Sequence, residues 1–142
     1  MTARAERELL APRQDVWGLV AEPFHLPDWW PGYTGVTPDR RGLAEGARWE
    51  VMRGRAPGFL RRPGGRGTIV LERVVPGIEL RWLDVAQGLT AGIALENAGE
   101  GRTRATAYVE GPAWRLWLEG AQGAPRQALS RLHDLCQTAS NI

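Results

Sequence analysis

The stretch APRQDVWGLVAEPFHLPDWWPGYTGV, residues 11–36, decides how this chain is expected to fold. Pro12 stands where helices often begin with proline, because the fixed backbone angle of proline suits the first helical turn. After it, apolar residues recur with the spacing of one helical face: Val16, Leu19 and Val20. Glu22 and Pro23 end this helix, since a residue that precedes proline disfavours helical geometry. The sequence therefore predicts a helix of about three turns that stops at Glu22.

The second half of the stretch, residues 22–36, holds bulky side chains but cannot form long regular structure. Its prolines exclude a long helix or a central strand, because proline has no backbone N–H to donate: Pro23, Pro27 and Pro31. Large aromatic residues nevertheless lie among them: Trp29, Trp30 and Tyr33. We therefore expect a compact bend rich in aromatic surface, followed by a short strand near Val36.

Strands are expected on both sides of this stretch. Residues 3–11 alternate weakly and predict a first strand, and residues 46–111 alternate clearly with the period of two that is typical of strands. One face of the alternation carries Trp49, Val51, Ile69, Leu71, Arg73, Leu80, Trp82, Asp84, Ala91, Ile93, Leu95, Ala105, Ala107 and Val109. Short turns rich in glycine and proline separate the strands, so successive strands pair antiparallel and form one meander.

The chain is expected to end in an amphipathic helix that opens at Pro125. Its apolar stripe follows helical spacing, with Leu135 at the margin: Leu129, Leu132, His133 and Cys136. Residues 113–124 are either a separate helical turn or a kinked extension of this helix. We expect a single domain over residues 1–142, of the α+β class.

Composition excludes several classes of function. All 18 basic residues are arginine, which excludes lysine Schiff-base chemistry, and the formal net charge of +2 is too small to indicate a nucleic-acid partner. Cys136 is the single cysteine, so an internal disulfide is excluded and a zinc cluster is not expected. We find no signal-peptide core and no apolar run long enough for a membrane span. A cytoplasmic protein without metal or cofactor is therefore expected.

The inward face of the predicted sheet is uneven in size. Ala91, Ala105 and Ala107 stand where a filled core would place larger side chains, beside the aromatic Trp49 and Trp82. Small residues next to aromatic ones are typical of an internal apolar cavity. The alternative is that the terminal helix lies close to the sheet and fills this space itself.

The quoted stretch resembles the opening of START/SRPBCC proteins, in which an AP-x-x-x-VW helix precedes a Trp-Pro segment and a strand. The later EGARWEV, LERVVPG and terminal amphipathic helix are similar to that superfamily in order and spacing. The resemblance implies a helix-grip fold: a seven-stranded antiparallel sheet around a long C-terminal helix, with two short helices after the first strand. It further implies a hydrophobic ligand tunnel. We expect no cofactor, and either a monomer or a homodimer.

In this fold the Trp-Pro segment borders the mouth of the tunnel, which leads to two hypotheses. Trp30 and Tyr33 either form a gate or rim wall for an entering ligand, or the two tryptophans plug one end of the core. A gate predicts that Trp30→Ala and Tyr33→Ala weaken binding of an apolar probe more than they lower the melting temperature. The predicted ligand-binding residues are Trp30, Tyr33, Trp49, Val51, Ile69, Leu71, Arg73, Trp82, Asp84, Ile93, Leu95, Ala107, Leu129, Leu132 and Cys136.

Polyketide aromatase/cyclases of this superfamily are the enzymes that the chain resembles. They carry a Ser-x-Arg motif on a central strand, where the arginine can polarise a carbonyl; this chain has Leu71-Glu72-Arg73, which keeps Arg73 and lacks the hydroxyl. Tyr33 also matches, whereas a second arginine is replaced by Asp84. The candidate catalytic residues are therefore Arg73, Tyr33 and Asp84. Arg73 and Asp84 could equally form a buried ion pair.

Other potentially functional features have a simpler interpretation. The serines, Ser130 and Ser140, lie in the terminal helix region without a nucleophile-elbow motif. His133 is interpreted as a packed or rim histidine and Cys136 as a small core residue. Arginines gathered in residues 52–66, with Phe59, either form a solvated hairpin loop or touch phosphates or anionic lipid. The sequence thus predicts binding of a hydrophobic small molecule, lipid-like or aromatic; the alternative is a cyclase acting on such a ligand.

Overall fold

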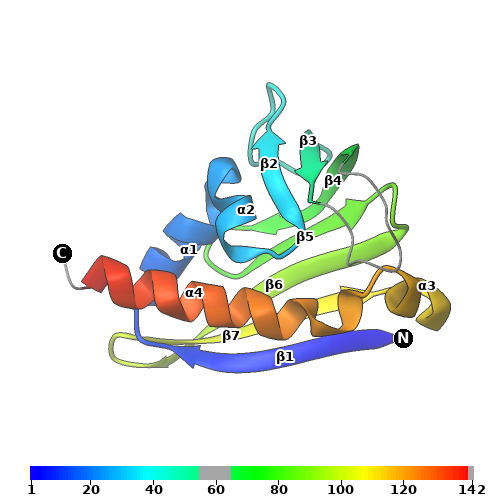
Figure 1. Cartoon of the computed structure of the whole chain (residues 1–142). Helices are drawn as coiled ribbons and strands as arrows, with labels where there is room; N and C mark the ends of the chain where they lie inside the picture. Colours follow the sequence, from blue (N-terminus) through cyan, green and yellow to red (C-terminus); the bar gives the residue numbers. More distant parts are fainter. Residues whose placement is uncertain (55–64, 141–142) are drawn as a thin grey trace.

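A computed structural model describes residues 1–54 and 65–140, with the side chains of Ala139 and Ser140 left aside (Figure 1). Seven strands are present in this part of the chain: β1 (Thr2–Leu9), β2 (Tyr33–Thr37), β3 (Arg48–Arg53), β4 (Arg66–Val75), β5 (Glu79–Asp84), β6 (Leu89–Gly99) and β7 (Arg102–Glu110). The helices are α1 (Arg13–Ala21), η1 (Pro23–His25), α2 (Leu26–Trp29), α3 (Ala113–Leu118), η2 (Ala121–Gly123) and α4 (Ala124–Ser140).

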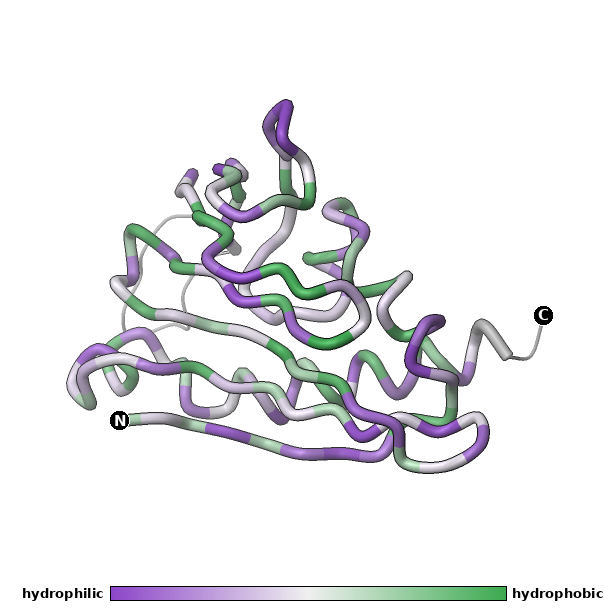
Figure 2. Tube along the Cα trace, turned by 180° about the vertical axis from the view of Figure 1, so that it is seen from behind, coloured by the Kyte–Doolittle hydropathy of each residue, from purple (hydrophilic) through white to green (hydrophobic). Residues whose placement is uncertain are grey.

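The strands form one antiparallel sheet in the order β1-β7-β6-β5-β4-β3-β2. Strands β2 to β7 follow one another across the sheet, and β1 pairs with the far edge of β7, so the predicted meander is confirmed. The alternation that predicted the strands also divides the two faces: Ile93 and Ala107 pair in register and are both buried. The opposite face carries cross-strand ion pairs, such as Arg104 with Glu6 at 3.2 Å. Figure 2 shows the resulting alternation of hydrophobic and hydrophilic residues along the strands.

Helix α4 crosses the apolar face of the sheet and contacts β1, β7 and α2 (Figure 1). Its apolar stripe turns toward the sheet, and Leu129, Leu132 and Cys136 are all buried. Burial of this stripe is what holds the helix in place, because the remaining faces of α4 are polar. The seven-stranded antiparallel sheet around a long C-terminal helix confirms the predicted helix-grip fold.

The segment before α4 is a separate helix and not an extension of it. Helix α3 ends at Leu118, and Gly120 takes a left-handed conformation with φ of 63° before η2 begins. Only glycine adopts this conformation at little cost, so Gly120 separates the two helices. The two alternatives for residues 113–124 are thus decided in favour of the separate turn.

The tryptophan-rich bend packs inside the molecule. Glu22 begins η1 by accepting a hydrogen bond from the backbone N–H of Phe24 at 3.4 Å, and α2 follows for a single turn. Helix α2 contacts both α4 and β2, which leaves Trp29 with no exposed surface and Trp30 with 5%. The bend therefore fills space between the terminal helix and the sheet. This burial agrees with the plug hypothesis for the two tryptophans.

One strand departs from the predicted alternation. The register of β4 against β5 shifts between Leu71, which pairs with Trp82, and Arg73, which pairs with Arg81. Two residues of β4 thus pass one residue of β5, and the side chains after the shift change faces. Arg73 consequently has a side chain that is 55% exposed and forms an ion pair with Glu79. The prediction of an inward Arg73 is wrong.

The arginine-rich run of residues 52–66 and the question of a membrane-spanning helix are addressed only in part by the structure. In the arginine-rich run, residues 55–64 lie outside the described residues; of the remainder, Arg66 opens β4 and lies 3.6 Å from Glu50 on the exposed surface. Within the described ranges, no helix is long and apolar enough to cross a membrane.

Candidate functional site

A buried carboxylate, that of Asp84 at the end of β5, is the centre of a polar cluster. Asp84 is 2% exposed, and its Oδ2 accepts a hydrogen bond from the Tyr33 hydroxyl at 2.7 Å. Its Oδ1 accepts from the Arg53 guanidinium and from the backbone N–H of Gln87 at 3.1 Å. Three donors therefore satisfy a charge that would be costly to bury alone. We call Tyr33, Arg53 and Asp84 the polar cluster.

The sheet brings these three residues together from separate strands. Tyr33 opens β2 and pairs in register with Arg53 at the end of β3. Between β3 and β5 lies β4, where Gly67 pairs with Val51. A Cβ atom added at Gly67 would lie 2.9 Å from Nη2 of Arg53, so the guanidinium passes over a position that has no side chain. The missing side chain lets Arg53 cross β4 and reach Asp84.

Burial and charge fix the protonation states of the cluster. Burial, followed by the charge of Asp84, raises the pKa of Tyr33 well above its usual value. Burial lowers the pKa of Arg53, but its hydrogen bond to Asp84 and the charge of that carboxylate outweigh this and raise it. At neutral pH Tyr33 is therefore a neutral phenol that donates, and Arg53 is a cation. The phenol cannot act as a base under these conditions.

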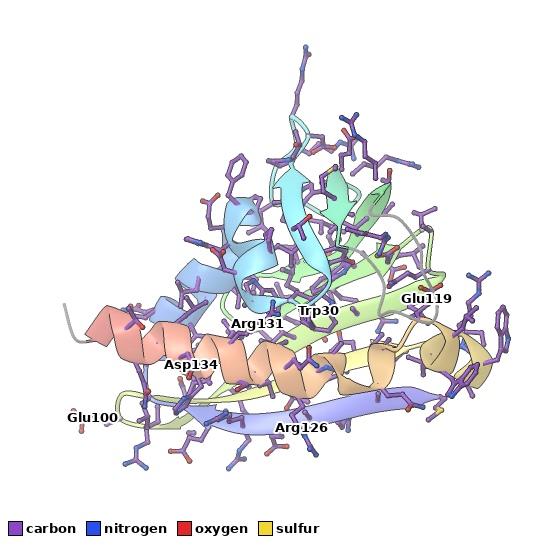
Figure 3. The ribbon with its side chains drawn as sticks, viewed as in Figure 1. Trp30, Glu100, Glu119, Arg126, Arg131 and Asp134 are labelled. Atoms are coloured by element: carbon purple, nitrogen blue, oxygen red, sulfur yellow. The ribbon has the colours of Figure 1, made fainter. Side chains whose placement is uncertain are left out.

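An aromatic cluster of Trp29, Trp30 and Trp82 adjoins the polar cluster. The rings meet edge to face, with centroids 5.1 Å apart for Trp30 and Trp82, and 5.9 Å apart for Trp29 and Trp82. Trp82 connects the two clusters, because its Nε1 donates to the Tyr33 hydroxyl at 3.3 Å. Figure 3 labels Trp30 at the centre of the molecule, above α4. An apolar wall thus ends on a small group of fixed polar side chains, as in many ligand sites.

The structure places the predicted ligand-binding residues, Arg73 excepted, in the interior. The buried ones are Trp30, Tyr33, Trp49, Val51, Ile69, Leu71, Trp82, Asp84, Ile93, Leu95, Ala107, Leu129, Leu132 and Cys136. Tyr33 and Asp84, two of the three catalytic candidates, come into direct contact. The predicted ion pair between Arg73 and Asp84 is wrong, because Asp84 pairs in register with Ile69, whereas Arg73 lies beyond the register shift. The cavity between helix and sheet stays a prediction.

Arg53 is the residue that the sequence interpretation missed. The alternation that placed Trp49 and Val51 on the inward face also places Arg53 there, two residues further on. The sequence interpretation instead groups Arg53 with the other arginines of residues 52–66. The signal that could have found Arg53 is therefore the inward–outward alternation of β3, which continues to the last residue of the strand.

The histidines and the cysteine give no further site. Nδ1 of His25 lies 3.1 Å from Asp28 on the surface, and His133 is half-buried beside Asp134. Cys136 is buried, which raises the pKa of its thiol and confirms that it belongs to the core. No group of three or more metal-ligating side chains occurs among the residues that the structure describes.

Comparison with solved structures supports the architecture. Protein NE0264 from Nitrosomonas europaea is 21% identical with a TM-score of 0.74, covering 98% of this chain and 96% of that one. The di-domain ARO/CYC BexL of the BE-7585A biosynthetic pathway is 15% identical with a TM-score of 0.75, covering 100% of this chain and 48% of that one. DynU16 of the dynemicin biosynthetic locus is 20% identical with a TM-score of 0.69, covering 97% and 48%. At these identities the likeness shows the fold alone.

Comparison of the sequence with protein families gives a match along nearly the whole chain. Among curated protein sequences, none matches. The family model described as polyketide cyclase / dehydrase and lipid transport matches residues 1–137. Because it covers nearly the whole chain, this match identifies the chain as a member of the polyketide cyclase/dehydrase and lipid transport family.

Proposed function

We propose that this protein binds an apolar small molecule, aromatic or lipid-like, between the sheet and α4. The observation that carries the proposal is the junction at Trp82, where a wall of tryptophans meets the polar cluster. Aromatic faces offer contact to an apolar body, and the buried phenol and guanidinium offer an end that recognises oxygen. The family, which includes lipid transport, supports the same class of ligand.

Binding is favoured over catalysis by the way the polar groups are paired. An enzyme of the cyclase type needs polar groups that converge on its substrate. Here Tyr33 and Arg53 converge on Asp84, and Arg73 pairs with Glu79 on the other face of the sheet. The three side chains therefore act as a fixed polar wall, with the carboxylate holding the two donors in place.

The experiment is a titration with the fluorescent probe N-phenyl-1-naphthylamine, together with native mass spectrometry of the purified protein. We expect saturable binding and a co-purifying apolar compound. Trp30→Ala, which removes part of the wall, is expected to weaken probe binding about tenfold or more, or about 1.4 kcal/mol. Phe24→Ala is the matched control, because Phe24 is an aromatic residue that is 64% exposed. Absence of saturable binding by the wild-type protein contradicts the proposal.

A cyclase is the second candidate function, and the neutral phenol of Tyr33 favours it. The Arg53 guanidinium lies 5.7 Å from the centre of the Tyr33 ring, so a proton donor and a cation adjoin each other. Such a pair can stabilise the oxyanion that forms when a polyketide closes a ring. If the protein is a cyclase, Tyr33→Phe, which keeps the ring and removes the hydroxyl, is expected to abolish turnover of a linear poly-β-ketone substrate. Binding of N-phenyl-1-naphthylamine to this variant is expected to stay within threefold of wild type. Unchanged turnover excludes this role.

A further inference from the structure

Trp29 has a buried hydrogen-bond donor without a partner. The residue has no exposed surface, and its Nε1 is the buried side-chain nitrogen or oxygen within the described residues that forms no hydrogen bond. An unsatisfied buried N–H is rare in native proteins, because it loses its bond to water without replacing it. The atom therefore needs an explanation.

Two other buried indoles of the same core have hydrogen-bond acceptors. Trp49 donates from Nε1 to the carbonyl oxygen of Gly42 at 2.7 Å, and Trp82 donates to the Tyr33 hydroxyl at 3.3 Å. The fold thus provides an acceptor for each of these two indoles. The contrast sets Trp29 apart from its neighbours in the core.

The position of Trp29 adjoins the proposed ligand site. Its ring meets Trp30 edge to face at 5.8 Å and Trp82 at 5.9 Å, and helix α2, which it ends, contacts α4. These neighbouring rings supply apolar surface and no oxygen. A ligand held against these rings would therefore lie beside the indole of Trp29.

We propose that Nε1 of Trp29 donates a hydrogen bond to an oxygen acceptor of the bound ligand. The inference rests on the proposed function and narrows it to one chemical class: apolar compounds that carry a carbonyl or ether oxygen on the apolar body. Such a compound satisfies the donor, whereas a pure hydrocarbon of the same shape leaves it unpaired. Trp29 therefore selects oxygenated ligands over hydrocarbons.

The test compares two probes of nearly the same shape, 1-tetralone and tetralin, which differ by one carbonyl group. Dissociation constants are measured for the wild-type protein and for Trp29→Phe, which keeps an aromatic ring and removes the donor. We expect the preference for 1-tetralone over tetralin to fall about three- to tenfold in the variant, the range of one neutral hydrogen bond. Looser packing after the substitution affects both probes alike and cancels in the ratio.

Trp114→Phe is the matched control, because it makes the same change at a residue that lies outside the aromatic cluster and is 59% exposed. We expect it to leave the ratio unchanged. An unchanged ratio in Trp29→Phe, or an equal fall in both variants, overturns the inference while the proposed function stands. If the wild-type protein binds neither probe, both fail together.

A second measurement uses the wild-type protein alone and therefore does not depend on whether a variant folds. In the wild-type protein labelled with nitrogen-15, the Nε1–H signal of Trp29 is expected to move downfield with 1-tetralone and to move less with tetralin. Equal movement with both probes contradicts the proposed hydrogen bond.

Discussion

At the scale of single residues, Asp84 holds the polar cluster together. Its removal leaves the Arg53 guanidinium without its carboxylate partner and the Tyr33 O–H without its acceptor, in a site where the Arg53 side chain is only 19% exposed. We therefore expect Asp84→Ala to lower the free energy of unfolding by about 3 kcal/mol, measured by urea denaturation.

Arg73→Ala is the matched control for Asp84→Ala. This arginine also forms an ion pair, with Glu79, but its side chain is 55% exposed. Exposed pairs contribute little, so the loss is expected to stay below about 1 kcal/mol. Equal losses in the two variants would mean that Asp84 is not held in a buried pair.

Both tyrosines of the chain are expected to resist ionisation. Burial, followed by the nearby Asp84, raises the pKa of Tyr33, and burial, followed by the hydrogen bond to Glu79, raises that of Tyr108. Because both values are raised in the folded state, this part of the stability is fully present below the unfolded pKa of about 10 and is lost as pH rises above it. An ultraviolet titration should show phenolate in the denatured protein near pH 10 and in the folded protein only at higher pH.

The residues of the site could be predicted only in part. Asp84 could be predicted because it lies at an inward position of a strand with clear alternation, whereas Tyr33 was predicted from the aromatic bend and the resemblance to the aromatase/cyclases. Arg73 was misplaced, because a register shift leaves no mark in the alternation of a single strand. Trp29 was placed in the core only by the plug hypothesis, and its unpaired N–H could not be predicted because it depends on the contacts of the folded core.

At the scale of elements, two glycines let side chains cross the sheet. Arg53 passes over Gly67 of β4 to reach β5, and Tyr108 of β7 passes over Gly92 of β6 to donate to Glu79 of β5 at 2.8 Å. A Cβ atom at Gly92 would lie 2.5 Å from the Tyr108 hydroxyl and 2.7 Å from the carbonyl oxygen of Leu80. Gly92 is therefore required by the contacts of the neighbouring strands, whereas at Gly67 an added Cβ would displace only the end of the Arg53 side chain.

Gly92→Ala is expected to destabilise the protein by about 1–3 kcal/mol, since backbone and side chain must both shift.

Gly18→Ala is the opposite case. Gly18 lies inside α1, and an added Cβ there meets no atom within 4 Å. The alanine is expected to stabilise the helix by about 0.5–1 kcal/mol. Thermal or urea unfolding of the two variants checks the difference in sign.

The elements themselves were largely predictable, and their junctions were not. Period-two alternation and the glycine- and proline-rich turns gave the meander, and Pro12 and Pro125 marked the helices. The break at Gly120 was undecided, because a glycine after six helical residues either ends a helix or is tolerated within one. Packing of the short α3 against the rest of the molecule decides between a helix that ends and a helix that continues. Such packing cannot be predicted from the local sequence.

At the scale of the whole molecule, a ligand between the sheet and α4 would join elements that are far apart in the sequence. Because such a ligand binds only the folded state, it stabilises that state by mass action. N-phenyl-1-naphthylamine at a hundred times its dissociation constant is expected to contribute about 2.7 kcal/mol. Differential scanning fluorimetry should then show a melting temperature higher by on the order of 10 °C. No increase at saturation would mean that the probe does not bind the folded state in preference to the unfolded state.

The short helix α3 has a practical consequence for all of these measurements. Its Trp114 and Trp117 are 59% and 73% exposed, whereas Trp29, Trp49 and Trp82 are almost completely buried. The intrinsic tryptophan fluorescence of the protein therefore has two components. The exposed indoles emit at longer wavelength and are quenched by acrylamide, whereas the buried indoles emit at shorter wavelength and are protected from it. Replacing the two α3 tryptophans with phenylalanine removes the first population. The remaining fluorescence comes mainly from the core tryptophans, so a ligand that binds in the core changes it directly.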